Sequence, residues 1–114
     1  MSERYNPYYS PEKFGLTTNC FDQSNMCYEY NTMCFFVTPD GRIYVASDSG
    51  CSCPTPFDNY RADSLESCVQ AMERIGSPNQ AMEILRSWNE GHNTYTQNDI
   101  AHLGEWVNEN LRKA

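Results

Sequence analysis

The first half of the chain has the pattern of apolar and polar positions that is typical of β-strands. From Met26 to Thr38 the run MCYEYNTMCFFVT is rich in aromatic and β-branched residues, and apolar side chains occupy both faces from Met33 onward. Residues 39–41, Pro-Asp-Gly, have the composition of a tight turn, and Arg42–Ala46 reads as the returning strand. We predict a hairpin here. A third strand at Gly15–Phe21 should pair with it, because two strands alone are marginally stable.

The second half changes to the spacing of amphipathic helices. Residues 47–62 contain one glycine and two prolines and predict a loop. After this loop, each of three apolar stripes at helical spacing is preceded by a helix-start signal. In chain order these signals are Asp63 with Glu66, Ser77 followed by Pro78, and Thr96 with Asp99. Strands followed by helices predict an α+β fold, with about three antiparallel strands packed against about three helices.

Length and the distribution of aromatic residues indicate one domain. The chain has 114 residues, and the aromatic half (1–62) and the helical half (63–114) are each small for an independent hydrophobic core. Only Trp88, Tyr95 and Trp106 represent the aromatic residues in the second half. We therefore expect the two halves to be two layers of the single domain 1–114.

The charge balance disfavours two classes of partner. The formal net charge is −7, which opposes nucleic-acid binding through phosphate neutralisation and adhesion to anionic membranes. No apolar run approaches the roughly 20 residues of a transmembrane helix. The first residues also lack the charged and apolar regions of a signal peptide. We expect an acidic cytoplasmic protein that binds neither nucleic acid nor membrane.

Six cysteines are an unusual number for a chain of this length. Without an export signal, the default is a reducing cytosol in which the thiols stay free. Cys51 and Cys53 form a Cys-x-Cys pair, whereas zinc sites commonly use Cys-x2–4-Cys. We therefore predict no metal and no other cofactor; if zinc were bound, Cys51 and Cys53 would be its ligands. A rigid loop that packs its small thiols under the sheet is the simpler reading.

A cysteine nucleophile is an alternative use of the same pair. Cys51 or Cys53 would need a base within hydrogen-bond reach, for which His92 or His102 could serve, with Asp48 orienting the base. These residues are far apart in sequence and match no local motif of cysteine enzymes. We therefore favour a protein without catalytic residues.

The aromatic segment 5–14, YNPYYSPEKF, is too rich in proline for a long helix. It predicts an extended segment that packs its rings across the edge of the sheet. The functional alternative is a binding surface, because exposed tyrosines favour contacts with partner proteins.

Two segments carry a resemblance to a known family. YYSPEKFGL (Tyr8–Leu16) and DSGCSCPTPF (Asp48–Phe57) resemble a family of small uncharacterised actinobacteriophage proteins, catalogued as a domain of unknown function. The resemblance covers about residues 8–60 and implies a bacteriophage origin, synthesis in the cytoplasm of the bacterial host and an accessory role. It implies no activity and no catalytic residues.

The leading hypothesis is a non-enzymatic phage accessory protein that binds a host protein, for host takeover or counter-defence. One alternative is an oligomeric sponge for a small ligand, with a pocket walled by Cys51–Pro54; another is a cysteine- or zinc-dependent enzyme. The predicted binding surface consists of Tyr5, Tyr8, Tyr9, Phe14, Asp48, Cys51, Cys53, Phe57 and Tyr60.

Overall fold

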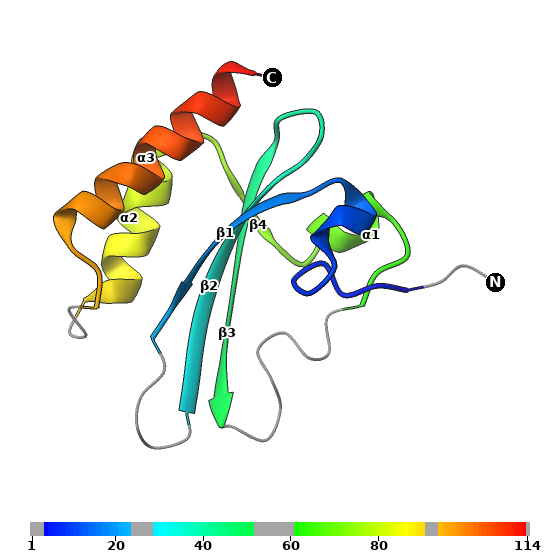
Figure 1. Ribbon diagram of the computed structural model, residues 1–114, viewed down its shortest axis with the longest axis horizontal. Coiled ribbons are helices and arrows are strands. Elements are labelled where there is room, and N and C mark those ends of the chain that lie inside the picture. Colours follow the sequence, from blue (N-terminus) through cyan, green and yellow to red (C-terminus); the bar gives the residue numbers. More distant parts are fainter. Residues whose placement is uncertain (1–3, 24–28, 52–60, 91–93, 114) are drawn as a thin grey trace.

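A four-stranded antiparallel sheet forms the centre of the molecule (Figure 1). The computed structural model describes residues 4–23, 29–51, 61–90 and 94–113. The strands follow one another in space as they do in sequence. In chain order the elements are a 3-10 helix η1 (Pro11–Phe14), β1 (Thr17–Asp22), β2 (Glu29–Val37), β3 (Ile43–Cys51), α1 (Leu65–Val69), β4 (Glu73–Ile75), α2 (Pro78–Asn89) and α3 (Gln97–Arg112). The predicted α+β class is confirmed, with four strands instead of about three.

The predicted hairpin is present as β2 and β3. Its register runs from Val37 opposite Ile43 to Glu29 opposite Cys51. In the turn, the Arg42 amide donates to the Thr38 hydroxyl at 2.9 Å, and Gly41 takes the left-handed region at φ 90°, which glycine adopts without a steric cost. β1 pairs antiparallel with the other edge of β2, as predicted for the third strand.

Side chains on β2 alternate between two covered faces of the sheet. Met33, Phe35 and Val37 belong to the core that α2 and α3 complete. Cys34 and Phe36 belong to a second core cluster, which includes residues of the N-terminal segment and of α1. Figure 1 shows α2 and α3 on one side of the strands and α1 with η1 on the other. We call the α2–α3 side the first face and the opposite side the second face. The prediction that β2 is covered on both sides is confirmed.

Two long helices cover the first face. Leu85 on α2 and Val107 on α3 have no exposed surface. Both helix starts are as predicted: the Ser77 hydroxyl accepts from the Gln80 amide at 3.1 Å, and Thr96 forms a complete capping box with Asp99. The helices approach closely at Gly104, where a Cβ would lie 2.6 Å from the Met82 sulfur.

A network of buried and partly buried side-chain amides joins α2 to the ends of β1 and β2. The Asn89 side chain, 8% exposed, accepts from the Thr94 and Tyr95 amides at 3.1 Å and donates to the Tyr95 carbonyl. Gln23 donates to Asn89, and Asn31 accepts from the Trp88 indole at 3.0 Å. Among the described residues, no buried side-chain nitrogen or oxygen lacks a partner. The network therefore fixes how the helices lie on the sheet without an unsatisfied polar atom.

Shorter elements cover the second face. The N-terminal segment is anchored by a bridge between Tyr5 and Ala62, with reciprocal backbone hydrogen bonds of 2.9 Å. The expectation of an extended segment is wrong beyond this bridge, because residues 7–9 form a turn and η1 follows. Leu16 is buried against this face.

The first predicted helix and the loop before it differ from expectation. α1 is a single turn, and its N-cap is Ser64, which accepts from the Ser67 amide, instead of Asp63. The chain then enters β4, which sequence patterning missed, and β4 pairs with Ile43–Val45 of β3. The predicted loop 47–62 is wrong at its start, because β3 continues through Cys51.

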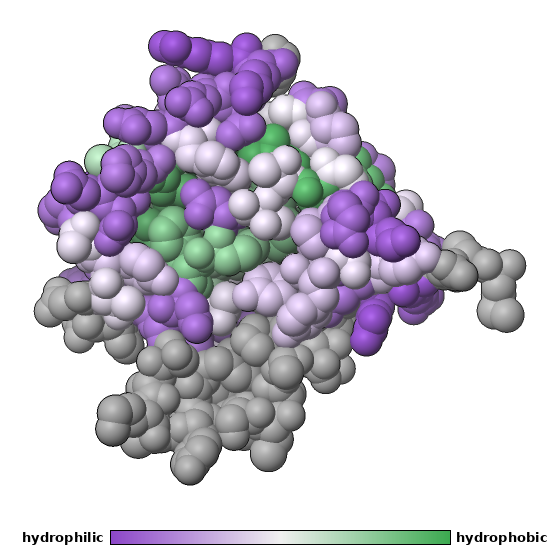
Figure 2. Space-filling model, in the orientation of Figure 1, coloured by the Kyte–Doolittle hydropathy of each residue, from purple (hydrophilic) through white to green (hydrophobic). Residues whose placement is uncertain are grey.

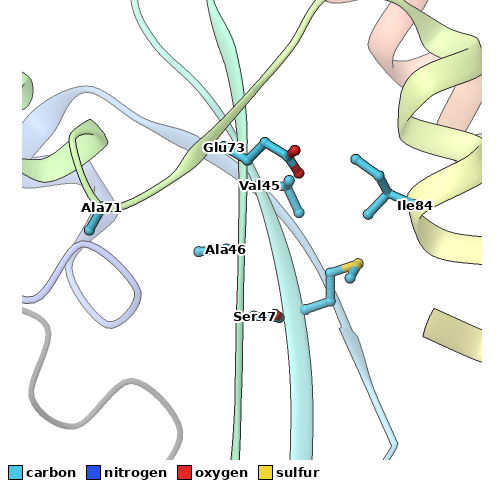
Figure 3. Close-up of a pocket in the computed structure, with 7 residues that line it drawn as sticks. Val45, Ala46, Ser47, Ala71, Glu73 and Ile84 are labelled. Carbon is cyan, nitrogen blue, oxygen red and sulfur yellow. The ribbon is translucent and has the colours of Figure 1, made fainter. Parts of the chain in front are cut away.

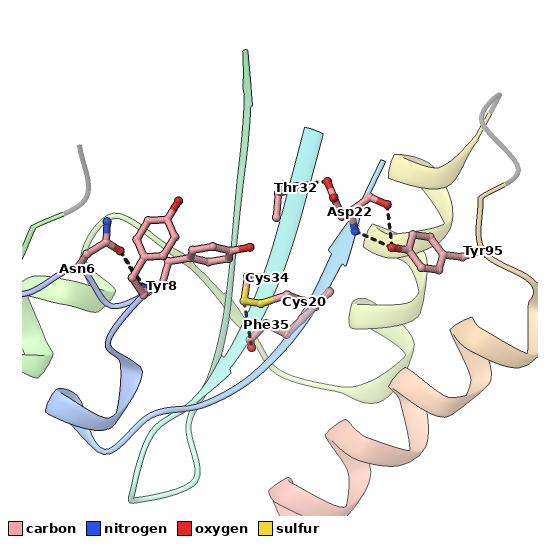
Figure 4. The surroundings of a disulfide bond; sticks show 9 residues. Asn6, Tyr8, Cys20, Asp22, Thr32, Cys34, Phe35 and Tyr95 are labelled. Atoms are coloured by element: carbon pink, nitrogen blue, oxygen red, sulfur yellow. Dashed lines mark hydrogen bonds between the residues drawn. A yellow bond between two sulfur atoms is a disulfide. The ribbon is translucent and has the colours of Figure 1, made fainter. Parts of the chain in front are cut away.

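A disulfide bond joins Cys20 on β1 to Cys34 on β2 (Figure 4). The two residues lie directly opposite each other in the strand register. The expectation that every thiol is free is therefore wrong for this pair. Cys68 is free and buried. Because disulfides are rare in a reducing cytosol, the cytoplasmic location stays a prediction.

None of the described helices is both long enough and apolar enough to cross a membrane.

Candidate functional site

The strongest candidate for a binding site is a turn at residues 6–10 that presents aromatic side chains. The side chain of Asn6 is buried, and its oxygen accepts from the Tyr8 amide at 2.9 Å and the Tyr9 amide at 3.4 Å. The Asn6 carbonyl also accepts from the Ser10 amide at 2.8 Å. An asparagine that bonds the backbone ahead of it imposes a turn. The direction in which Tyr8 and Tyr9 leave the backbone is therefore set locally.

The four predicted aromatic residues of this segment have different exposures. Tyr9 is 50% exposed, and it is the only exposed large hydrophobic residue among those that the structure describes. Tyr8 is partly buried, packs against the second core cluster and contacts Tyr9 edge to face, with ring centroids 4.9 Å apart. The Lys13 ammonium lies over the face of the Tyr5 ring, 4.9 Å from the ring centroid. Phe14 packs against the same core cluster, so its ring helps to support the turn.

A polar row crosses the sheet beside this turn. Asp22 on β1 and Asp48 on β3 are the register partners of Thr32 on β2, and all three lie on the second face by strand alternation. The buried Thr32 hydroxyl donates to the Asp22 carboxylate at 3.2 Å. Figure 4 shows Asn6 and Tyr8 on one side of the disulfide and Asp22 with Tyr95 on the other.

Burial, with Tyr9 and the Asp22 carboxylate as weaker causes, raises the pKa of the Tyr8 hydroxyl above its ordinary value. The hydroxyl therefore stays protonated at neutral pH and can donate a hydrogen bond. Tyrosine rings beside two carboxylates make a surface suited to cationic side chains, through ring faces and ion pairs.

The described part of the chain does not bring a cysteine, a histidine and Asp48 together. Cys51 ends β3, and the predicted residues Cys53, Phe57 and Tyr60 lie outside the described residues, as does His92. His102 is exposed on α3, which covers the first face, whereas Asp48 lies on the second. Within the described ranges, no group of three or more His, Cys, Asp or Glu could hold a metal ion.

Cys68, a free cysteine on α1, lacks the features of a nucleophile. Cys68 is 4% exposed, and burial raises the pKa of its thiol to about 11. A thiol with a raised pKa is mostly protonated at neutral pH and reacts slowly.

A pocket of about 310 Å³ lies where β4 begins, beside Val45 of β3 (Figure 3). It is lined by residues of β2, β3 and α2 and of the segment that enters β4: Met33, Val45, Ala46, Ser47, Ala71, Glu73 and Ile84. Sequence reasoning missed this pocket because it depends on β4. Sequence reasoning also missed Asn6, although an asparagine before a proline is a recognised turn signal.

Comparison with known proteins places the chain in a family without adding a described activity. No curated protein and no solved structure matches it. A family model matches residues 5–114, which includes the helical half that the resemblance left out. The chain therefore belongs to the family described as a domain of unknown function, DUF7574.

Proposed function

We propose that this chain is a non-enzymatic bacteriophage accessory protein that binds a host protein through the turn at residues 6–10. The observation that carries this proposal is the half-exposed Tyr9 ring on a turn that the buried Asn6 side chain holds in place. Tyrosine is enriched among residues that dominate binding energy, since it offers a large contact area with little conformational freedom to lose. The phage origin and the host partner rest on the resemblance of the two sequence motifs.

The charges around the turn favour a partner with basic side chains. Asp22 and Asp48 flank Thr32 on the same face, and the chain has a net charge of −7. Complementary charge speeds association and selects between partners. A surface of tyrosine rings and carboxylates therefore fits a host protein that presents lysine or arginine.

Affinity capture in an actinobacterial host tests the proposal. The tagged chain is compared with Tyr9→Ser and with Asn108→Ser, a control at an exposed position on α3. We expect the wild type and the control to enrich the same host protein to the same extent. Tyr9→Ser should weaken binding of that purified partner by about thirtyfold, the loss of about 2 kcal/mol that is typical of an interface hot spot.

Two results would overturn the proposal. One is equal affinity of the purified partner for the wild type and for Tyr9→Ser, while circular dichroism shows both to be folded. The other is the enrichment of no host protein over a tag-only control.

A further inference from the structure

The outer edge of β3 continues beyond its partner strand. β4 pairs only with Ile43–Val45, whereas β3 extends to Cys51. Among the described strands, none pairs with the outer edge of β3 at Ser47 or Ser49. A strand edge of this kind can accept an extended peptide through backbone hydrogen bonds, while pockets beside it select side chains.

The pocket beside this edge has apolar walls and one carboxylate. Met33, Val45 and Ile84 contribute apolar side chains. Glu73 is the register partner of Val45, and in Figure 3 its carboxylate lies beside Val45 and on the side toward Ile84. Figure 2 shows apolar surface gathered between the polar helices and the strands on this side of the molecule.

The Glu73 carboxylate takes part in none of the ion pairs of the described residues. The pocket therefore combines apolar side chains with one carboxylate that has no ion-pair partner among the described residues. Lysine and arginine have the matching construction, because an aliphatic stem carries a cationic head.

We propose that β3 binds an extended peptide as an added antiparallel strand, with an arginine or lysine side chain in this pocket. The peptide residue opposite Ser47 lies two register positions beyond Glu73 along the edge, on the same face as Glu73, and strand alternation turns its side chain toward α2. Its stem packs on Val45 and Ile84, and its cation pairs with Glu73. About five residues of peptide would span Ser47–Cys51, at roughly 3.4 Å per residue.

This surface is separate from the turn at residues 6–10. The apolar pocket residues Met33, Val45 and Ile84 lie on the α2 side of the sheet, whereas Tyr9 belongs to the second face. The inference therefore does not depend on the proposed function, and Tyr9→Ser should leave peptide binding unchanged.

A peptide titration tests the proposal by fluorescence anisotropy. The probe is a fluorescein-labelled heptapeptide, Thr-Val-Thr-Arg-Thr-Val-Thr. One matched control replaces arginine by citrulline, a neutral side chain of nearly the same shape. A second control carries N-methyl groups on alternate amides, which removes the donors that an added strand uses. We expect each control to bind roughly tenfold more weakly than the probe, a difference of about 1.4 kcal/mol.

A charge-neutralising variant of the protein completes a double-mutant cycle. Glu73→Gln should weaken binding of the arginine peptide by about tenfold and leave binding of the citrulline peptide unchanged. Glu105→Gln, at an exposed position on α3, should bind both peptides as the wild type does. Amide hydrogen exchange should slow at Ser47 or Ser49 when the arginine peptide is bound.

Three outcomes would overturn the proposal. They are no binding of the arginine peptide at 1 mM, equal binding of the citrulline and arginine peptides, and protection of amides elsewhere than on β3. A dimer in sedimentation velocity that buries the β3 edge would instead assign this edge to a second copy of the chain.

Discussion

The two faces of the sheet are covered by different kinds of structure. The first face packs against α2 and α3, whose buried residues include Leu85, Leu103 and Val107. The second face is covered by a turn, η1 and the single turn of α1, and its core includes small residues such as Ala46 and Ala62. A disulfide adds a covalent link on that side. We infer that the first face supplies most of the stability, whereas the second face uses local bonds to hold its aromatic turn.

The largest expected effect contrasts one leucine from each core. Leu85→Ala should lower the free energy of unfolding by about 4 kcal/mol, because Leu85 is fully buried between rigid elements. Leu16→Ala should cost about 2 kcal/mol, since short segments can relax around the smaller side chain. Urea unfolding measures both. Equal losses would contradict the division of stability between the two faces.

The disulfide gives the next largest effect. Cys20 and Cys34 are 14 residues apart, and closing a loop of this length stabilises a protein by roughly 3 kcal/mol through the unfolded state. Reduction should therefore lower the free energy of unfolding by about that amount. The control is the double variant Cys20→Ser with Cys34→Ala, whose stability should not respond to the reductant. If reduction left the free energy of unfolding of the wild type unchanged, the disulfide would not stabilise the second face.

The smallest effect concerns the pH dependence of the second core. Burial raises the pKa of the Cys68 thiol to about 11 from an ordinary value of 9.0. The folded state thus favours the protonated thiol. The stability that follows from this preference is fully present below about pH 9. It is lost as the pH rises from about 9 to 11, by up to about 2 kcal/mol.

The free energy of unfolding across this pH range should fall more steeply for the wild type than for Cys68→Ala. If the free energy of unfolding fell equally with pH in the two proteins, the second core would admit enough water to solvate the thiolate.

Features encoded by neighbouring residues were predictable from the sequence. The hairpin followed from alternation and a Pro-Asp-Gly turn, and the starts of α2 and α3 followed from their capping residues. β4 was not predictable, because Glu73–Ile75 is too short to show alternation and its partners lie about 30 residues earlier. The Cys20–Cys34 pair depends on the register between β1 and β2, which a strand prediction does not fix.

The same limit applies to the candidate sites. The tyrosines were found from composition, since an aromatic segment is visible in the sequence itself. The division of roles between Tyr9, which is exposed, and Phe14, which supports the turn, required the packing of the second face. The pocket at Glu73 required both β4 and α2, so it combines three parts of the chain that no local pattern connects.

The order of the strands has a consequence for how the chain folds. β1, β2 and β3 pair with their neighbours in sequence, and α2 contacts α3 across a short connection. Such contacts close small loops, which costs little entropy and favours fast folding. The pairing of β4 with β3 closes a much longer loop. We expect the three strands β1–β3 and the pair of helices α2 and α3 to form first. The pairing of β4 with β3 should then be the step that limits the folding rate.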